Sequence, residues 1–265
     1  MENYHTHTVR CKHARGYEED YIEAAIRKGF SVLGFSDHVP VPYPKGFVSG
    51  IRMDVSEIED YTETLSKLRD KYKDDIQILI GYEAEYMPPF FDEMMKRIWE
   101  YPLDYLIQGQ HFVKDEISGF YAGSPTTEEE RLKDYVDVTI EGMKTGVFSC
   151  LAHPDLIHFI GDADLYRAQM GRLIKEAISL NIPLEVNALG YLTRRNYPCS
   201  AFFSLASEMN ADFIYGCDAH SPDAILRPEE IHGFPQFLEK NNITFTEKPF
   251  NFPLKEAAQN HTEPH

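Results

Sequence analysis

Histidine and carboxylate residues recur along this chain in short clusters, and these side chains are the ones that bind divalent metal ions such as zinc. Most clusters directly follow a run of apolar or β-branched residues, which is typical of a buried strand. In order, the clusters are His5-Thr6-His7, Asp37-His38, Glu83-Ala84-Glu85, His111, His153, Glu185 and Asp218-Ala219-His220. Polar groups at the ends of many different strands form the active site of a βα-barrel. The pattern therefore predicts a hydrolase that uses several metal ions.

The spacing inside three of these clusters supports a shared site. Residues two apart on a strand point to the same face, and this spacing relates His5 to His7, Glu83 to Glu85, and Asp218 to His220. Taken singly, each histidine is better explained as a hydrogen-bonded core or loop residue. Six histidines and several carboxylates at strand ends are different, because burying them unpaired would be costly. A metal cluster removes that cost.

The segments that carry the clusters alternate between strand-like and helix-like patterns. Strands are predicted around His5 and at 31–35, 76–80, 103–107, 147–151, 182–186 and 213–214. Helices are predicted at 17–28, 54–72, 90–99, 127–144, 164–180 and 201–209, with a helix-like stretch at 222–240 that Pro228 and Pro235 interrupt. This alternation predicts parallel βα units in one α/β domain over 1–265, with a frayed tail at about 254–265. The Pro- and Gly-rich segment 39–53 is a candidate substrate loop.

Composition restricts the partners of the chain. The 26 basic and 43 acidic residues give a net charge of −17, which disfavours nucleic acid and anionic membranes as partners. Bound metal ions can still attract a small anionic substrate by reversing the charge locally. The N-terminus has no signal-peptide pattern, and the four cysteines form no CxxC pair, so we predict a reduced, cytoplasmic protein. The oligomeric state is left open between a monomer and a small homo-oligomer. No motif in context supports a serine hydrolase, a kinase or a dehydrogenase.

The clusters, read with their neighbours, resemble the successive motifs of a known superfamily. The matching stretches are His5-Thr6-His7 with His13-Ala14, Gly34-Phe35-Ser36-Asp37-His38, Gly81-Tyr82-Glu83-Ala84-Glu85, Gly109-Gln110-His111-Phe112, Ala152-His153-Pro154-Asp155 and Asp218-Ala219-His220. In order and spacing they look like the polymerase-and-histidinol-phosphatase (PHP) superfamily, over residues 3 to about 250. The stretch Cys11-Lys12-His13-Ala14 and the Pro-rich segment after His38 resemble the histidinol-phosphate phosphatase branch.

This resemblance implies a distorted seven-stranded (β/α)7 TIM-like barrel that holds two to three divalent ions of zinc, iron or manganese. Carried onto the matching positions, it implies one metal bound by His5, His7, Glu83 and Asp218. Glu83 would bridge to a second metal completed by His111 and His153, and a third metal would be bound by His13, His38 and His220. A metal-bridging hydroxide would attack phosphorus, and either Asp218 or His220 would protonate the leaving group.

Further residues are expected to bind substrate or to orient the ligands. Glu85 would either support a ligand or contact the substrate amino group, and Asp37 would orient a ligand histidine. A guanidinium commonly holds a phosphate through two oxygens, and the candidates are Arg167, Arg194 and Arg195. An ordinary solvated surface charge is an equally good interpretation of each arginine.

The expected function is hydrolysis of L-histidinol phosphate in histidine biosynthesis. Hydrolysis of another small phosphomonoester, or a phosphodiesterase or nuclease activity, is the alternative, although the charge of −17 and the absence of basic patches count against a nuclease. A non-catalytic metal-binding module would lack ligands, and none is missing. A deaminase or amidohydrolase would share histidines at strand ends, but the metal-bridging lysine on which such enzymes usually depend cannot be placed here.

Overall fold

Seven parallel strands form the centre of the molecule, which a computed structural model describes for residues 1–254. The strands are β1 (Glu2–Asn3), β2 (Val32–His38), β3 (Gln77–Ala84), β4 (Tyr105–Gln108), β5 (Cys150–Leu151), β6 (Leu184–Asn187) and β7 (Phe213–Gly216). They pair in the order of the sequence, and every pair is parallel. A parallel bridge between Thr6 and Ala219 brings the chain after β1 beside the chain after β7. The predicted seven-stranded barrel is therefore confirmed.

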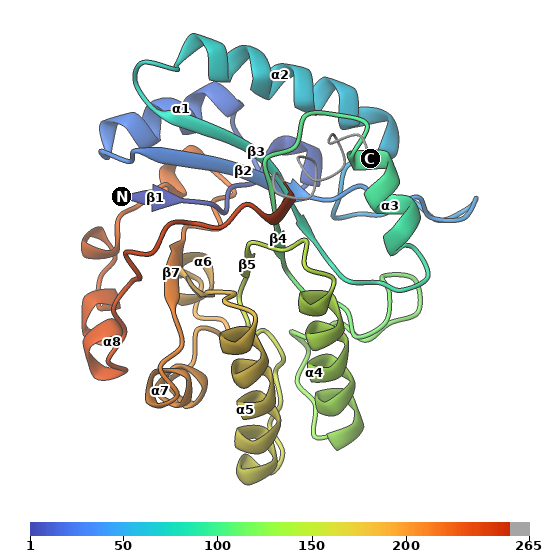
Figure 1. The fold of residues 1–265 in the computed structure, drawn as a ribbon, viewed down its shortest axis with the longest axis vertical. Coiled ribbons are helices and arrows are strands. Elements are labelled where there is room, and N and C mark those ends of the chain that lie inside the picture. The colour runs from blue at the N-terminus through green and yellow to red at the C-terminus, as the bar shows by residue number, and fades with distance from the viewer. Residues whose placement is uncertain (255–265) are drawn as a thin grey trace, which may run out of the picture.

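Helices lie outside the strands, as Figure 1 shows. They are α1 (Glu18–Arg27), α2 (Ile58–Lys71), α3 (Phe91–Ile98), α4 (Glu129–Lys144), α5 (Ala163–Ser179), α6 (Ala188–Leu192), α7 (Ser200–Glu208) and α8 (Phe234–Lys240). The six firmly predicted helices correspond to α1–α5 and α7, and α6 is an additional short helix. The helix-like stretch 222–240 divides into two 3-10 turns, Pro222–Ala224 and Pro228–Glu230, followed by α8. Pro228 begins the second turn, and Gly233, with a φ of +81°, lies at the N-cap of α8.

One large side chain, Tyr105, lies at the centre of the small apolar cluster that packs the interior of the barrel. Tyr105 is fully buried and donates a hydrogen bond to the Tyr4 carbonyl oxygen at 2.7 Å. Its ring requires glycine at two positions, one on β2 and one on β3, because a Cβ at Gly34 would lie 2.2 Å from Tyr105 Oη and one at Gly81 would lie 2.5 Å from Tyr105 Cε1. The interior of the barrel is thus packed below the strand ends, so the space available for an active site lies at the carboxyl ends of the strands.

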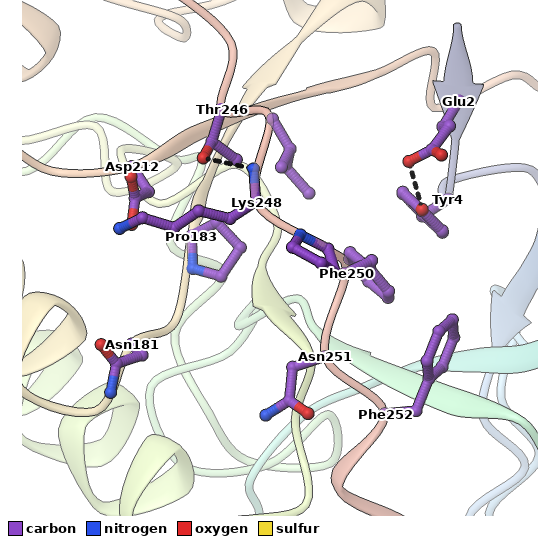
Figure 2. Close-up of a pocket in the computed structure, with 12 residues that line it drawn as sticks. Glu2, Tyr4, Asn181, Pro183, Asp212, Thr246, Lys248, Phe250, Asn251 and Phe252 are labelled. Carbon is purple, nitrogen blue, oxygen red and sulfur yellow. Dashed lines mark hydrogen bonds and ion pairs between the residues drawn. The ribbon is translucent and has the colours of Figure 1, made fainter.

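The opposite end of the barrel, where the strands begin, is crossed by the chain after α8. Phe245 forms a bridge with Phe213, and the Phe250 ring stacks on Tyr4 with centroids 3.6 Å apart. A pocket of about 600 Å³ lies here (Figure 2). Its lining is largely apolar, and Lys248 in it pairs with Asp212. Leu254, where the predicted tail begins, is buried, and 255–265 lie outside the described residues.

No helix in residues 1–254 is long and apolar enough to cross a membrane.

Candidate metal centre

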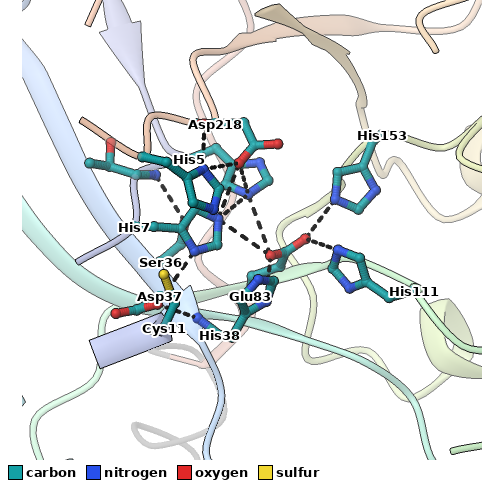
Figure 3. A network of polar contacts seen from close by, with 12 residues as sticks. His5, His7, Cys11, Ser36, Asp37, His38, Glu83, His111, His153 and Asp218 are labelled. Carbon is teal, nitrogen blue, oxygen red and sulfur yellow. Dashed lines mark hydrogen bonds and ion pairs between the residues drawn. The ribbon is translucent and has the colours of Figure 1, made fainter. Parts of the chain in front are cut away.

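Seven of the nine predicted ligands line one cavity of about 240 Å³ at the carboxyl ends of the strands. The other two, His5 and His153, are buried in contact with the lining residues His7 and Glu83. His5 and His7 follow β1, His38 ends β2, and Glu83 lies near the end of β3. His13 follows the 3-10 helix Val9–Cys11. The remaining ligands come from the loops after β4, β5 and β7, and they are His111, His153, Asp218 and His220. Figure 3 shows the imidazoles of the five labelled histidines directed at the Glu83 and Asp218 carboxylates, and these are His5, His7, His38, His111 and His153. The register of parallel strands therefore collects residues that are up to 215 positions apart in sequence.

Four donor atoms form a compact cage at the centre. His5 Nε2 and His7 Nε2 are 3.1 Å apart. Glu83 Oε2 lies 3.6 Å from the first and 3.5 Å from the second. Asp218 Oδ1 lies 3.5 and 3.2 Å from the same two nitrogens. Tetrahedral ligands with zinc bonds of about 2.0–2.1 Å stand about 3.3–3.4 Å apart, so the cage has the dimensions of a zinc site.

The other oxygen of Glu83 faces a second set of donors. Glu83 Oε1 lies 2.7 Å from His153 Nε2 and 3.5 Å from His111 Nε2. One carboxylate thus presents an oxygen to each of two ligand sets, as a bridging ligand would. The space for this carboxylate depends on Gly109, since a Cβ at that position would lie 1.9 Å from Glu83 Oε1.

A third group of imidazoles lies at the mouth of the cavity. His13 Nε2 and His220 Nε2 are 2.9 Å apart, and His13 is exposed. The expected partner His38 has its Nδ1 turned to Glu83 Oε2 at 2.9 Å. A donor atom of His38 also lies within 4.8 Å of donors on His7 and His220. His38 therefore stands between the cage and the His13–His220 pair.

The imidazoles are oriented by bonds made through their other ring nitrogen. His5 Nδ1 contacts Glu185 Oε1 at 2.7 Å, and His111 Nδ1 contacts Glu85 Oε1 at 2.9 Å. His7 Nδ1 lies 3.4 Å from Asp37 Oδ1. In each case the Nε2 atom is left to face the cavity, which is the arrangement that fixes a metal-binding tautomer.

Unsatisfied polar atoms test whether the residues fit a metal cluster. Within residues 1–254, Asp218 Oδ1 and His153 Nδ1 are buried without a hydrogen-bond partner, and Glu83 Oε2 lies 2.9 Å from His38 Nδ1 in a geometry that forms no hydrogen bond. Burial opposes the ionisation of Glu83, but the charges of His111, His38 and His5 hold its pKa well below the ordinary value. An ionised, buried oxygen without a hydrogen bond requires a cation. The donor set and its unpaired atoms therefore fit bound divalent ions.

Of the residues predicted to support ligands or to bind substrate, two contact the ligands, one lines the cavity and two do not reach it. Glu85 and Asp37 are fully buried behind His111 and His7, so they contact ligands and do not line the cavity. Arg195 lines the cavity and donates to Tyr197 Oη at 2.8 Å. The structure does not bring the other two arginines to the cavity.

Those two arginines lie on the surface. Arg167, on α5, is more than half exposed and pairs with Glu208 of α7 at 2.7 Å, because the early turns of α5 face solvent. Arg194 is exposed with a φ of +54° at the end of α6, and it does not line the cavity.

Other residues of the site were not predicted from the sequence. Tyr121, Tyr197 and Leu189 line the cavity from loops and from α6, and no spacing pattern indicates them, whereas Ile51 comes from the predicted substrate loop 39–53. Cys11 is buried beside the histidines. Burial opposes its ionisation, but the neighbouring imidazoles of His13, His220 and His7 lower the pKa of its thiol to about 3.

Comparisons with known proteins agree with this geometry. A probable histidinol-phosphatase of Deinococcus radiodurans is 25% identical over 229 residues, which are 83% of this chain and 86% of the relative. A histidinol-phosphatase of Bacillus subtilis is 29% identical over 120 residues, 43% of this chain and 45% of the relative.

Solved structures have the same fold. A histidinol phosphate phosphatase of Lactococcus lactis, in complex with zinc, L-histidinol and phosphate, has a TM-score of 0.70 at 18% identity and covers 95% of this chain and 97% of its own. The family model for the PHP domain matches residues 3–189, more than two thirds of the sequence. The strand-end ligands thus occur in the framework that their spacing indicated, and the chain belongs to the PHP family.

Proposed function

We propose that this protein is a metal-dependent phosphomonoesterase that hydrolyses L-histidinol phosphate to L-histidinol and phosphate. The observation that carries the proposal is the cage of His5, His7, Glu83 and Asp218, with Glu83 facing a second pair of imidazoles. The choice of substrate is supported by the histidinol-phosphatases to which the chain is similar.

Two to three divalent ions would be bound by the nine residues His5, His7, His13, His38, Glu83, His111, His153, Asp218 and His220. When bound, such ions lower the pKa of water and neutralise charge on the phosphoryl oxygens. Zinc, manganese and iron all accept nitrogen and oxygen donors. The donor set of the cage therefore does not select one of these three metals.

The residues of the chain itself determine which ester can enter. The volume of about 240 Å³ suits a small molecule. Arg195 is held by Tyr197 at one side of the cavity, where its guanidinium can bind a phosphate through two N–H groups. Phe112 and Tyr121, whose ring centroids are 5.8 Å apart, line the cavity as well and offer apolar faces to an imidazole ring.

The leaving alkoxide requires a proton, and Asp218 and His220 are the candidates to donate it. Asp218 Oδ2 accepts a hydrogen bond from Asn187 at 3.1 Å, and His220 Nδ1 contacts the Asp218 carbonyl oxygen at 3.0 Å. Both side chains line the cavity. A substitution of either residue would change metal binding as well, so single-turnover rates at matched metal content are needed to separate the two roles.

We further propose a cytoplasmic location and a small-molecule partner. The four cysteines are free, and three of them are buried, as expected in a reducing compartment.

A phosphate-release assay on metal-loaded protein tests the proposed function. The panel contains histidinol phosphate, sugar phosphates, nucleotides and a bis-aryl phosphodiester, with metal content measured on the same sample. We expect kcat/KM to favour histidinol phosphate by about 100-fold, which is ~2.7 kcal/mol. Uniform activity on all monoesters would refute the substrate, and a preference for the diester would refute the monoesterase assignment.

A further inference from the structure

Cys11 lies where a metal-binding thiol would lie. It ends the 3-10 helix Val9–Cys11, between the His5-Thr6-His7 motif and His13, and it is fully buried. Its Sγ and donor atoms of His13 and His220 all lie within 4.8 Å of one another. Figure 3 shows the sulfur beside His7 and Asp37. The thiol is therefore surrounded by imidazoles and a carboxylate.

The two imidazoles nearest the mouth point to a cation between them and the sulfur. His13 Nδ1 is 2.6 Å from the Cys11 carbonyl oxygen, so this nitrogen carries the proton and donates it. His220 Nδ1 donates in the same way to the Asp218 carbonyl oxygen at 3.0 Å. Each neutral ring then has a lone pair on Nε2, and the two Nε2 atoms are 2.9 Å apart. Facing lone pairs repel, and a shared cation removes the repulsion.

A purely structural role for Cys11 is disfavoured by comparison with the other buried cysteines. A buried cysteine usually behaves as a small apolar residue. Cys150 packs in the apolar cluster around Tyr105, and Cys217 packs in the main hydrophobic core. Within residues 1–254, Cys11 belongs to neither cluster. Its burial is thus a feature of the polar centre and not of the core.

We propose that the Cys11 thiolate is a ligand of the outermost metal ion, together with His13 and His220. Zinc binds thiolate sulfur at about 2.3 Å and imidazole nitrogen at about 2.0–2.1 Å, so tetrahedral sulfur and nitrogen ligands stand about 3.6 Å apart. The side chains need only small movements to reach that spacing. A thiolate is a soft ligand, and it favours zinc over manganese at this position.

The consequence is a centre with two chemically different kinds of site. The cage around Glu83 offers imidazole and carboxylate donors, which several divalent ions accept. The outer site offers sulfur, and it would retain zinc when the cage holds manganese or iron. This inference assumes the metal-dependent activity proposed above, but it does not depend on which phosphate ester is the substrate.

Cobalt spectroscopy tests the ligand directly. Metal-stripped full-length protein is titrated with Co²⁺, because a cobalt–thiolate bond gives a strong near-ultraviolet charge-transfer band that nitrogen and oxygen ligands do not give. We expect the band in the wild type and its loss in Cys11→Ser, with the visible cobalt bands of the cage retained. Cys199→Ser is the matched control, since Cys199 is free and does not line the cavity, and it should keep the band.

Two results would overturn the proposal: a band that persists in Cys11→Ser, or the absence of a band in wild-type protein that has bound three cobalt ions. If Cys11→Ser does not fold, X-ray absorption on zinc-loaded wild type replaces it, and the absence of sulfur scattering at about 2.3 Å contradicts the assignment. The phosphate-release assay is read separately. If the enzyme shows no preference for histidinol phosphate but the cobalt–thiolate band is present, the proposed substrate is refuted and the proposed Cys11 ligand is supported.

Discussion

Arg52 gives the sharpest test of how the centre is supported. It is only 1% exposed, and it links the 39–53 loop to the ligands. Its Nε donates to Glu116 Oε2 at 2.7 Å, and its Nη2 donates to Glu85 Oε1 at 3.2 Å. The same Glu85 oxygen contacts His111 Nδ1 at 2.9 Å. Arg52→Met keeps much of the volume and removes the charge, which leaves both carboxylates without their cation.

The size of the effect follows from that burial. Removal of one partner from a buried ion pair costs about 3–5 kcal/mol, because the other charge remains uncompensated. For a domain of this size each kcal/mol lowers Tm by roughly 2–4 °C, so Arg52→Met should lower Tm by roughly 6–20 °C. Loss of an outer partner of a ligand also lowers metal affinity by about 10–100-fold. We therefore expect weaker metal binding in this variant as well as lower stability.

The pH dependence of stability gives a second measurement of the same contact. Burial opposes the ionisation of Glu85, but Arg52 and then His111 lower its pKa below the ordinary value of 4.5. A depressed carboxylate pKa stabilises the fold above the unfolded pKa, and this stabilisation is lost as the pH falls from about 4.5 through the folded pKa. Arg52→Met should reduce the slope of stability against pH in that acid range.

Calorimetry of metal-free and metal-loaded protein between pH 3.5 and 7 measures both effects. The range reaches about one unit below the ordinary pKa of a glutamate and extends well above it, where the carboxylate is fully ionised. Arg172→Met is the control, because Arg172 pairs with Asp137 while both side chains are about half exposed. Such a pair contributes about 0–1 kcal/mol. If Arg52→Met is no less stable than Arg172→Met, the reasoning about the buried network is wrong.

Three further changes test the centre and the substrate contacts. Gly109→Ala should displace Glu83, reduce the amount of bound metal and lower kcat by about 100-fold, while the circular dichroism spectrum stays unchanged. Full metal content of the variant by mass spectrometry would contradict this prediction. Arg195→Gln should raise KM for the phosphate ester by about 10–100-fold through loss of a charged hydrogen bond, whereas Arg167→Gln should not. Zinc binding at pH 7.5 should release about one or more protons. The reason is that carboxylates, led by Glu185, raise the pKa of His5 well above its ordinary value although burial opposes this. Calorimetry in buffers of different ionisation enthalpy measures the number of protons released.

The parts of the fold that depend on local pattern could be predicted from the sequence. Apolar runs that end in ligand-type residues identify the strands, and a parallel barrel places all their carboxyl ends together. The position of Glu83 follows from this rule, because the strand that contains it runs unbroken from Gln77 to Ala84. The rule also predicts that Asp218 meets His5 and His7, although more than 200 residues separate them.

Features that depend on packing between distant loops could not be predicted in this way. Arg167 and Arg195 look alike in sequence, but α5 carries the first into solvent and the turn after α6 carries the second to the cavity. Arg52 lies in an irregular loop, and its partner Glu116 is 64 positions away. Cys11 has no patterned spacing at all. In each case the side chain's role is set by neighbours that no local periodicity specifies.

On the proposed function, we infer from the balance of charge that the centre would hold three metal ions and not two. Five buried carboxylates contact the imidazoles directly, and they are Asp37, Glu83, Glu85, Glu185 and Asp218. Arg52 does not reduce this charge, because it is balanced by Glu116. Two divalent ions would then leave the centre negative within a chain that already carries −17, and it would repel a phosphate dianion. A third ion makes the centre positive, or neutral when Cys11 is a thiolate, and Arg195 then adds the charge that attracts the ester.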